Sequence, residues 1–296
     1  APPKVGVTAA ESGTYTDFCN INNGGLKPDG TDGVNDVTYL ILDVIDEMRL
    51  LQPSSNLQLS RKNPDKFLRR GLEIVRKGWG QPSIFNADAV VEELLRQGKS
   101  LEDAWRGGTS GCVETGAFGN EAYILTGYFN LPKVLEITLN NGYDPRTRKE
   151  IGIKTGDPRQ FTSFDQLFDA FGKQLEHFLN IKIRGNNVIE RLYAEYMPAP
   201  FLSLLVNDCI AKGRDYNDGG PRYNSTYIMG VAPGTCTDSL AALKCHVFER
   251  HDLTMDELLQ ALAENFEGKE KTRLLLWNKT PNYGNDDDYA DDILQR

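Results

Sequence analysis

The sequence predicts a helix-rich fold with short strands between the helices. Apolar residues recur three or four positions apart along most of the chain, which is the periodicity of helices with one buried face. Segments rich in Gly, Asn and Pro separate these runs, as is typical of loops. The composition, with 40% hydrophobic and 25% charged residues over 296 positions, is that of a globular protein with a large core.

Local signals place the first helices. Residues 1–30, rich in Gly, Thr and Asn, predict a strand end followed by a loop. An apolar-periodic run over Val37–Leu51 predicts a helix that stops before the next proline. Asn63-Pro64 predicts an N-cap followed by the first residue of a second helix, and Asn86 opens a third. Ser100–Asp103 resembles the capping box of a short helix.

The second half carries the longest helical pattern, which begins at Ser163 and continues toward Tyr196. Lys133–Leu139 fits a helix or a strand, and we favour a helix. A helix from about Leu202 to Ala211 is expected next, and Thr237 is expected to cap another. Thr254–Glu257 predicts a capping box for a helix through the following apolar run.

Composition excludes several function classes. The net charge is −9 with no long basic run, which argues against a nucleic-acid partner. No stretch approaches the roughly 18 apolar residues of a membrane span, so no membrane association is expected. Five scattered cysteines without CxxC spacing, and three histidines without HxxxH spacing, argue against disulfides and a metal site. The cysteine pattern indicates the reducing cytoplasm.

The segment Gly111–Gly116 reads Gly-Cys-Val-Glu-Thr-Gly and is too rich in glycine for a regular helix. If it is extended, Cys112 and Glu114 point to the same side and can address one pocket. Lone cysteines are usually small buried hydrophobes, and we interpret the other four in that way. For Cys112 the flanking glycines and the neighbouring carboxylate favour a functional role.

Three roles for Cys112 compete on the residues alone. A nucleophilic thiolate needs a histidine or another cation that lowers its pKa, and such a group would have to come from a distant part of the chain. A metal ligand needs further Cys or His partners. A radical thiol needs burial, a hydrogen-atom donor and an adjacent acid or base, and Glu114 supplies the last of these.

The segment Arg106–Gly116 resembles the active-site cysteine loop of the glycyl radical enzymes, the superfamily of pyruvate formate-lyase. Gly-Cys-Val-Glu is similar to the signature of its dehydratase and lyase branch. Further segments resemble this branch: Val7–Ser12, Leu51–Asn56, Lys77–Pro82, Tyr196–Pro200, Gly220–Asn224 and Gly234–Ala241. The resemblance implies part of a ten-stranded α/β barrel made of two five-stranded halves, with the cysteine loop inside. It also implies that residues 1–296 are one continuous portion of the catalytic domain.

Within this branch the polar positions resemble those of the trans-4-hydroxy-L-proline dehydratases. That group places a serine 100 positions before the cysteine, then an Asp-Phe pair, and a tyrosine 16 positions after the cysteine. Here these positions hold Ser12, Asp17, Phe18 and Tyr128. The alternative interpretation is that Ser12 and Asp17 are caps of loops and that the aromatic residues pack in the core. By resemblance, Ser12 binds the substrate carboxylate, and Phe18 and Tyr128 enclose the ring.

The resemblance implies radical dehydration of hydroxyproline to 1-pyrroline-5-carboxylate. A thiyl radical on Cys112 would take hydrogen from C5, Glu114 would transfer the proton that the leaving hydroxyl needs, and Asp17 would hold that hydroxyl. The rival activities are those of choline trimethylamine-lyase, isethionate sulfite-lyase and propanediol or glycerol dehydratase, which share Cys-x-Glu. Ser12 argues against the choline lyase, and the sequence does not clearly show the arginines that a sulfonate pocket needs.

The family carries its glycyl radical in a C-terminal Arg-Val-x-Gly-Tyr motif, and this sequence contains no such motif. We therefore expect an internal fragment that lacks the N-terminal third and the glycyl radical domain, and that does not turn over in isolation. An inactive truncated homologue is the remaining alternative. No cofactor is expected to bind directly. The family's radical is installed by an activating enzyme that uses S-adenosylmethionine and a [4Fe-4S] cluster, and the full-length protein is expected to be a homodimer.

Overall fold

The computed structural model describes residues 20–51, 53–110 and 113–296. Contacts divide the chain into two compact units. Unit 1 comprises residues within Ala1–Ile124 together with Arg191–Tyr227. Unit 2 comprises Leu125–Glu190 and Ile228–Arg296. The expectation of one continuous catalytic portion stays a prediction.

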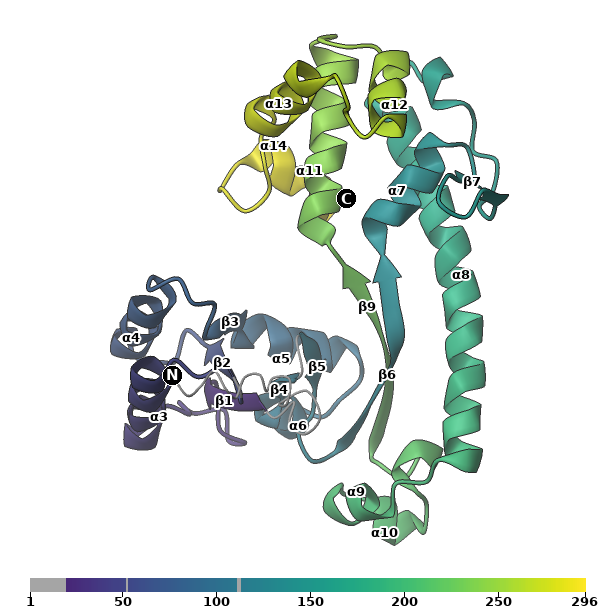
Figure 1. Cartoon of the computed structure of the whole chain (residues 1–296). Coiled ribbons are helices and arrows are strands. Elements are labelled where there is room, and N and C mark those ends of the chain that lie inside the picture. Colours follow the sequence, from purple (N-terminus) through teal and green to yellow (C-terminus); the bar gives the residue numbers. More distant parts are fainter. Residues whose placement is uncertain (1–19, 52, 111–112) are drawn as a thin grey trace. The chain divides into compact units, whose positions relative to one another are not determined.

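Unit 1 contains a parallel three-stranded sheet in the order β1-β2-β3. Parallel strands need a crossover connection, and helix α3 supplies it between β1 and β2, as α4 does between β2 and β3. The two helices pack against each other (Figure 1). The elements are β1 (Asn20–Gly24), α3 (Asp36–Met48), β2 (Ser54–Leu59), α4 (Asp65–Val75), β3 (Ser83–Asn86) and α5 (Ala87–Arg96).

The central strand β2 is the most buried strand of this sheet, as expected for a parallel strand with neighbours on both sides. Its Leu57 packs with Leu42 of α3 and with Phe67 and Ile74 of α4. Gly71 of α4 lies so close that a Cβ atom there would collide with the Leu57 side chain. Glycine at this position therefore lets α4 approach the sheet.

After α5 the chain forms helix α6 (Leu101–Arg106) and an antiparallel hairpin of strands β4 (Gly108–Ser110) and β5 (Glu114–Gly116). Leu94 of α5 packs with Ala104 of α6 under this hairpin. A Cβ atom on Gly107, which joins α6 to β4, would lie 2.7 Å from the Gly116 carbonyl oxygen. The glycines of this segment therefore permit a close approach of two backbones.

Strands β6 (Glu121–Asn130) and β9 (Tyr223–Val231) pair in a two-stranded sheet, and both contain residues of each unit. Unit 1 also contains three short helical elements, which are α9 (Pro200–Leu205), α10 (Cys209–Lys212) and η2 (Tyr216–Asp218). The prediction of one helix from about Leu202 to Ala211 is wrong. Asp208 has a φ of +75°, a left-handed conformation that a continuous helix cannot contain, and the helix is therefore split in two.

Unit 2 is mainly helical, and its core lies among α7, α8, α11 and α12. Fully buried Leu167 of α8 packs there with Leu240 of α11 and Leu258 of α12. Its elements are α7 (Leu131–Leu139), β7 (Tyr143–Asp144), β8 (Lys149–Glu150), η1 (Pro158–Gln160), α8 (Phe164–Tyr196, which ends in unit 1), α11 (Pro233–Ala242), η3 (Leu243–Glu249), α12 (Met255–Ala263), α13 (Glu270–Lys279) and α14 (Asp288–Gln295).

Several helix starts confirm the capping signals. Asn86 caps α5, and Thr254 with Glu257 forms both bonds of the capping box of α12. Two starts differ from prediction. Pro64, not Asn63, is the N-cap of α4, because the Asn63 side chain accepts the Ser60 N–H and donates to the Gly25 carbonyl instead.

Thr237 lies inside α11 rather than at its start, because the helix already begins at Pro233, where proline suits the first turn. The predicted helices over Lys133–Leu139 and from Ser163 toward Tyr196 are confirmed by α7 and α8. None of the helices in the described ranges combines the length and apolar character that a bilayer crossing requires.

Candidate functional site

Glu114 is the first residue of β5, and only 8% of it is exposed. The β4–β5 ladder places it opposite Ser110, so the ends of the segment that contains Cys112 are held close together. The backbone N–H of Val113 donates to Glu114 Oε2 at 3.2 Å. Glu114 is therefore a buried acidic side chain on a strand whose backbone the hairpin holds in place.

Cys112 itself lies outside the described residues, as do Ser12, Asp17 and Phe18. Their contacts with Glu114 stay predictions. Tyr128 lies in β6 and is 66% exposed, so it is not a core aromatic residue within unit 2. Glu114 belongs to unit 1 and Tyr128 to unit 2.

Lys99 of the α5–α6 connection, Glu121 of β6, and Ser225 and Tyr227 of β9 form a group that is called the Glu121 cluster. The side chains of Lys99 and Glu121 are buried, and those of Ser225 and Tyr227 are partly buried. The Lys99 ammonium lies 2.8 Å from Glu121 Oε1, and their side chains are 2% and 0% exposed. Ser225 donates to the same oxygen, and the Ala117 N–H donates to Oε2 at 2.7 Å. A buried ion pair is tolerated only when its remaining hydrogen-bonding positions are also filled, as they are here.

Tyr227 connects this cluster to the hairpin. Its hydroxyl donates to the Thr115 carbonyl, and its ring stacks on Tyr123 with centroids 5.6 Å apart and planes 7° apart. Burial raises the pKa of Tyr227, so the hydroxyl remains a donor at neutral pH. The Thr115 hydroxyl also donates to Glu93 of α5 at 3.0 Å. Thr115, the residue after Glu114, is therefore held from two sides.

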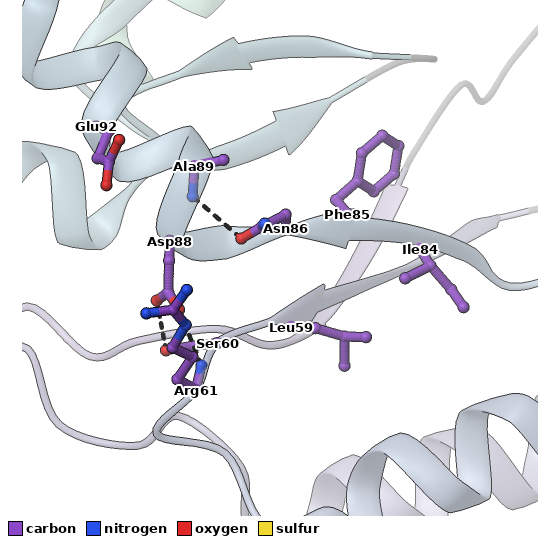
Figure 2. A pocket seen from close by; sticks show the side chains of 9 residues that line it. All are labelled: Leu59, Ser60, Arg61, Ile84, Phe85, Asn86, Asp88, Ala89 and Glu92. Atoms are coloured by element: carbon purple, nitrogen blue, oxygen red, sulfur yellow. Dashed lines mark hydrogen bonds between the residues drawn. The ribbon is translucent and has the colours of Figure 1, made fainter. Parts of the chain in front are cut away.

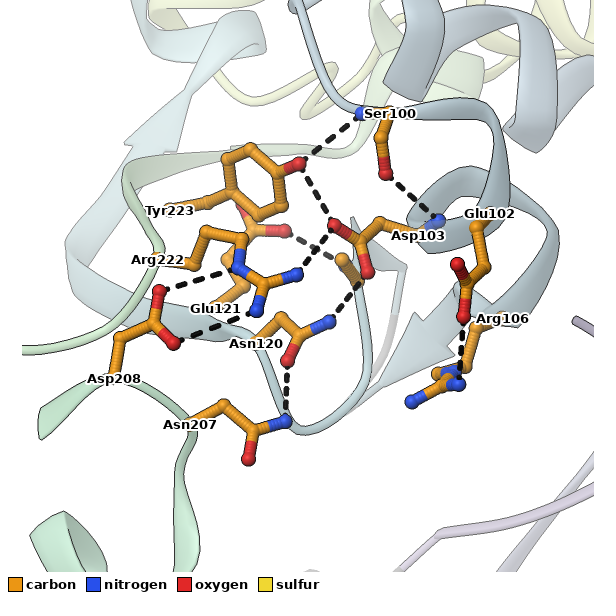
Figure 3. Close-up of polar contacts among 11 residues, drawn as sticks. Ser100, Glu102, Asp103, Arg106, Asn120, Glu121, Asn207, Asp208, Arg222 and Tyr223 are labelled. Carbon is orange, nitrogen blue, oxygen red and sulfur yellow. Dashed lines mark hydrogen bonds and ion pairs between the residues drawn. The ribbon is translucent and has the colours of Figure 1, made fainter. Parts of the chain in front are cut away.

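A second group, the Asp103 cluster, holds the chain before the hairpin (Figure 3). Asp103 of α6 accepts hydrogen bonds from Tyr223 Oη at 2.8 Å, from Arg222 at 3.2 Å and from Asn120. The Ser100 N–H donates to the Tyr223 hydroxyl at 3.1 Å. Burial opposes ionisation of Asp103, but the bonds from Tyr223, Ser100 and Arg222 outweigh it and hold the pKa of this carboxyl below its ordinary value.

The Asp103 cluster explains a motif whose role the sequence did not reveal. Gly220–Asn224 contributes Arg222 and Tyr223 to the Asp103 cluster, and Arg222 also pairs with Asp208 at 3.2 Å (Figure 3). Sequence reasoning missed Glu121 altogether. Its signal was a single charged residue that begins an apolar and aromatic run, since a charge inside such a strand is retained when a partner lies opposite.

An open cavity of about 650 Å³ lies at the carboxyl ends of β2 and β3 (Figure 2). Asp88 at the start of α5 accepts hydrogen bonds there from Ser60 Oγ at 2.6 Å and from the Arg61 N–H at 2.9 Å. Its carboxylate therefore fixes the loop after β2. Neither Glu114 nor Tyr128, the two predicted site residues within the described ranges, lines this cavity, whose lining is Leu59, Ser60, Arg61, Ile84, Phe85, Asn86, Asp88, Ala89 and Glu92.

The described residues include no group of three or more His, Cys, Asp or Glu side chains placed to hold a metal ion. Three cysteines, at positions 209, 236 and 245, are buried free thiols, in agreement with their interpretation as small hydrophobes. Burial raises the pKa of the Cys236 thiol to about 11. The Cys236 thiol is therefore a poor nucleophile at neutral pH.

Comparison with known proteins agrees with the loop signature. The family model described as pyruvate formate lyase-like matches residues 1–296. The chain is 63% identical over 295 residues to trans-4-hydroxy-L-proline dehydratase of Clostridioides difficile, covering 100% of this chain and 37% of that protein. It is 32% identical to (2S)-3-sulfopropanediol dehydratase of Klebsiella oxytoca, covering 98% of this chain and 35% of that protein.

Solved structures give the same result. The crystal structure of hydroxyproline dehydratase from Clostridioides difficile, with its substrate trans-4-hydroxy-L-proline bound, matches with a TM-score of 0.87 at 63% identity over 100% of this chain and 37% of that chain. The B12-independent glycerol dehydratase of Clostridium butyricum matches with a TM-score of 0.81 at 35% identity, over 95% of this chain and 35% of that chain. The present chain thus spans little more than a third of these relatives. Because the family match extends over its whole length, the chain belongs to the pyruvate formate lyase-like family and has the α/β fold of part of a glycyl radical enzyme barrel.

Proposed function

We propose that the protein containing this chain dehydrates trans-4-hydroxy-L-proline to 1-pyrroline-5-carboxylate by radical chemistry. The observation that carries the proposal is the 63% identity to a hydroxyproline dehydratase across the whole chain. Identity to relatives that act on other substrates is much lower, at 32% for the sulfopropanediol dehydratase and 33–35% for isethionate sulfite-lyases. All residues with proposed roles in the pocket lie in the matched segment.

The reaction begins at Cys112. The family's glycyl radical, on a residue outside this chain, supplies the oxidation of this thiol to a thiyl radical. The sulfur takes a hydrogen atom from C5 of the substrate, so an S–H bond forms as a C–H bond breaks. The C4–O bond then breaks, the hydroxyl leaves as water with an added proton, and the ring nitrogen gives up a proton. Return of the hydrogen atom from Cys112 to C4 leaves the C5=N double bond and regenerates the thiyl radical.

Glu114 is the proposed proton-transfer group. Hydroxide is a poor leaving group, so the departing oxygen needs a proton as its bond to carbon breaks. Glu114 lies two residues after Cys112, it is buried, and β5 fixes its backbone. One carboxyl group can give its proton to the hydroxyl and recover a proton from the ring nitrogen, which leaves it unchanged after each turnover.

The remaining proposed roles concern the substrate pocket. Asp17 orients the C4 hydroxyl, and Ser12 binds the carboxylate. Phe18 and Tyr128 enclose the ring, exclude water and hold C5 near the sulfur. The exposed position of Tyr128 within unit 2 supports this role, because its side chain remains available to a ligand. No metal is proposed in this pocket.

We also propose that the complete protein works in the anaerobic cytoplasm as a homodimer. A radical S-adenosylmethionine enzyme with a [4Fe-4S] cluster would install the glycyl radical. The proposed partners do not include nucleic acid or a membrane. Light scattering of the complete protein tests the dimer, and a glycyl radical signal that depends on the activating enzyme tests the activation.

A chimera tests the substrate assignment. Residues 1–296 replace the matching segment of the Clostridioides difficile relative, and the chimera is activated anaerobically. We expect hydroxyproline to be dehydrated faster than propane-1,2-diol or glycerol, with no cleavage of choline or isethionate. Faster turnover of any of these four substrates would overturn the assignment, and so would inactivity with hydroxyproline in a fully activated chimera. The isolated chain, incubated with the activating enzyme, is expected to show neither turnover nor a radical signal.

A further inference from the structure

The Glu121 cluster is a buried ionic group for which the proposed chemistry has no use. Lys99 lies at the end of the α5–α6 connection, and its ammonium contacts Gln97 Oε1 at 2.6 Å as well as Glu121. Both charged side chains are almost completely withdrawn from solvent. Replacing such a pair with apolar residues is often neutral or stabilising, so stability alone does not account for it.

Two hydrogen bonds connect this cluster to β5 and to the residue that follows it. Glu121 accepts the Ala117 N–H, and Tyr227 donates to the Thr115 carbonyl. These two backbone groups flank Gly116 and follow directly on Glu114. A shift of the β5 backbone would break a hydrogen bond in a buried site, where an unpartnered polar group is unfavourable. The cluster therefore resists displacement of the strand that carries Glu114.

We propose that Tyr227 and Glu121 are positioning residues, which fix the backbone of β5 and thereby the Glu114 carboxylate for proton transfer. The inference rests on the proposed function. Proton transfer requires hydrogen-bonding distance between the acid and the leaving oxygen. A displacement of about 1 Å lowers catalytic rates by as much as about a hundredfold, so small movements of β5 are sufficient to matter.

The structure offers a matched control in the same ring stack. Tyr123 and Tyr227 are both partly buried and lie face to face. The Tyr227 hydroxyl holds Thr115, whereas the Tyr123 hydroxyl is buried and has no hydrogen-bond partner among the described residues. Tyr227→Phe and Tyr123→Phe each remove one oxygen and preserve the stack. Only the first removes a bond to β5.

The test compares these two variants in the activated chimera. We expect Tyr227→Phe to lower kcat about tenfold with KM changed less than twofold, and to increase the solvent deuterium isotope effect on kcat. Tyr123→Phe should match the unchanged chimera. A lower fraction of folded enzyme would reduce kcat equally in H2O and D2O and cannot produce this pattern. Equal kcat for the two variants, or an unchanged isotope effect, would overturn the inference.

Hydrogen exchange separates this inference from the substrate assignment. Amides of residues 113–117, followed by mass spectrometry in the same chimera without activation, should exchange faster in Tyr227→Phe than in Tyr123→Phe. This readout needs no turnover. Inactivity of the unchanged chimera with hydroxyproline would contradict the proposed function alone, whereas equal exchange in the two variants would contradict the positioning role alone.

Discussion

The Lys99 ammonium and the Glu121 carboxylate form an ion pair at 2.8 Å in which neither side chain is appreciably exposed. Its geometry is completed by the Ala117 N–H and by Ser225, so each oxygen of Glu121 has a partner. Removal of one partner from such a pair leaves a buried charge without compensation, which is far more unfavourable than the loss of an ion pair at the surface.

Lys99→Met retains most of the side-chain volume but removes the ammonium group, which leaves the Glu121 charge without its partner. The substitution should therefore destabilise the protein by about 3–5 kcal/mol. Thermal unfolding of the chimera measures the effect. Lys271→Met is the control, since Lys271 lies exposed on α13 and should change the unfolding temperature little. Similar unfolding temperatures for the two variants would show that Glu121 is stabilised by its other partners alone.

Gly116→Ala should destabilise the hairpin. A Cβ atom at this position would collide with the Tyr123 hydroxyl and lie 2.8 Å from Glu121 Oε2. Overpacking of this kind costs about 1–3 kcal/mol, measured as a lower unfolding temperature. Gly185→Ala in α8 is the matched substitution in open space and should be neutral or slightly stabilising, since alanine favours helix. An unfolding temperature at least equal to that of the parent in Gly116→Ala would contradict the packing around this glycine.

Glu114→Gln should lower kcat by about 10²- to 10⁴-fold, the usual contribution of a general acid or base. The amide preserves the size of the side chain and removes the ionisable carboxyl group. The glycyl radical signal after activation should stay at the parent level, because the radical is installed elsewhere. Anaerobic turnover and electron paramagnetic resonance of the same sample measure both quantities. Near-normal dehydration would remove Glu114 from proton transfer.

The sequence predicts correctly those features whose residues lie close together in the chain. The Asn86 cap and the capping box at Thr254 depend on residues at most three positions apart, and the structure has both. The segment around Glu114 was singled out because its residue types stand side by side. By contrast, Arg222 meets Asp103 across 119 positions, and no local pattern reports such a pairing.

The same distinction explains the errors. The split between α9 and α10 depends on the left-handed backbone of Asp208 and on Asn207, whose N–H and side chain bind Gly119 and Asn120. These contacts join segments about 87 residues apart in the chain, and they override a local helical pattern. The Glu121 cluster was missed for the same reason, since its members come from the two strands β6 and β9 and from the α5–α6 connection.

The stability of unit 1 should depend on pH through Asp103. Hydrogen bonds from Tyr223, Ser100 and Arg222 hold its folded-state pKa below the ordinary value. A carboxyl group with a lowered folded-state pKa contributes stability above its unfolded pKa of about 3.9, and that contribution is lost as the pH falls through the folded value. Asp103→Asn, which cannot ionise, should therefore unfold at a lower temperature than the parent at pH 6.

The difference between Asp103→Asn and the parent should shrink as the pH falls below about 4, because protonated Asp103 has lost the same charge. Asp286→Asn is the control, since Asp286 is exposed near the C-terminus and should follow the parent at every pH. Unfolding temperatures measured from pH 6 to pH 3 give the comparison. A difference that stays constant over this range would mean that Asp103 acts through the shape of its side chain, and that its charge does not hold Arg222 and Tyr223 against α6.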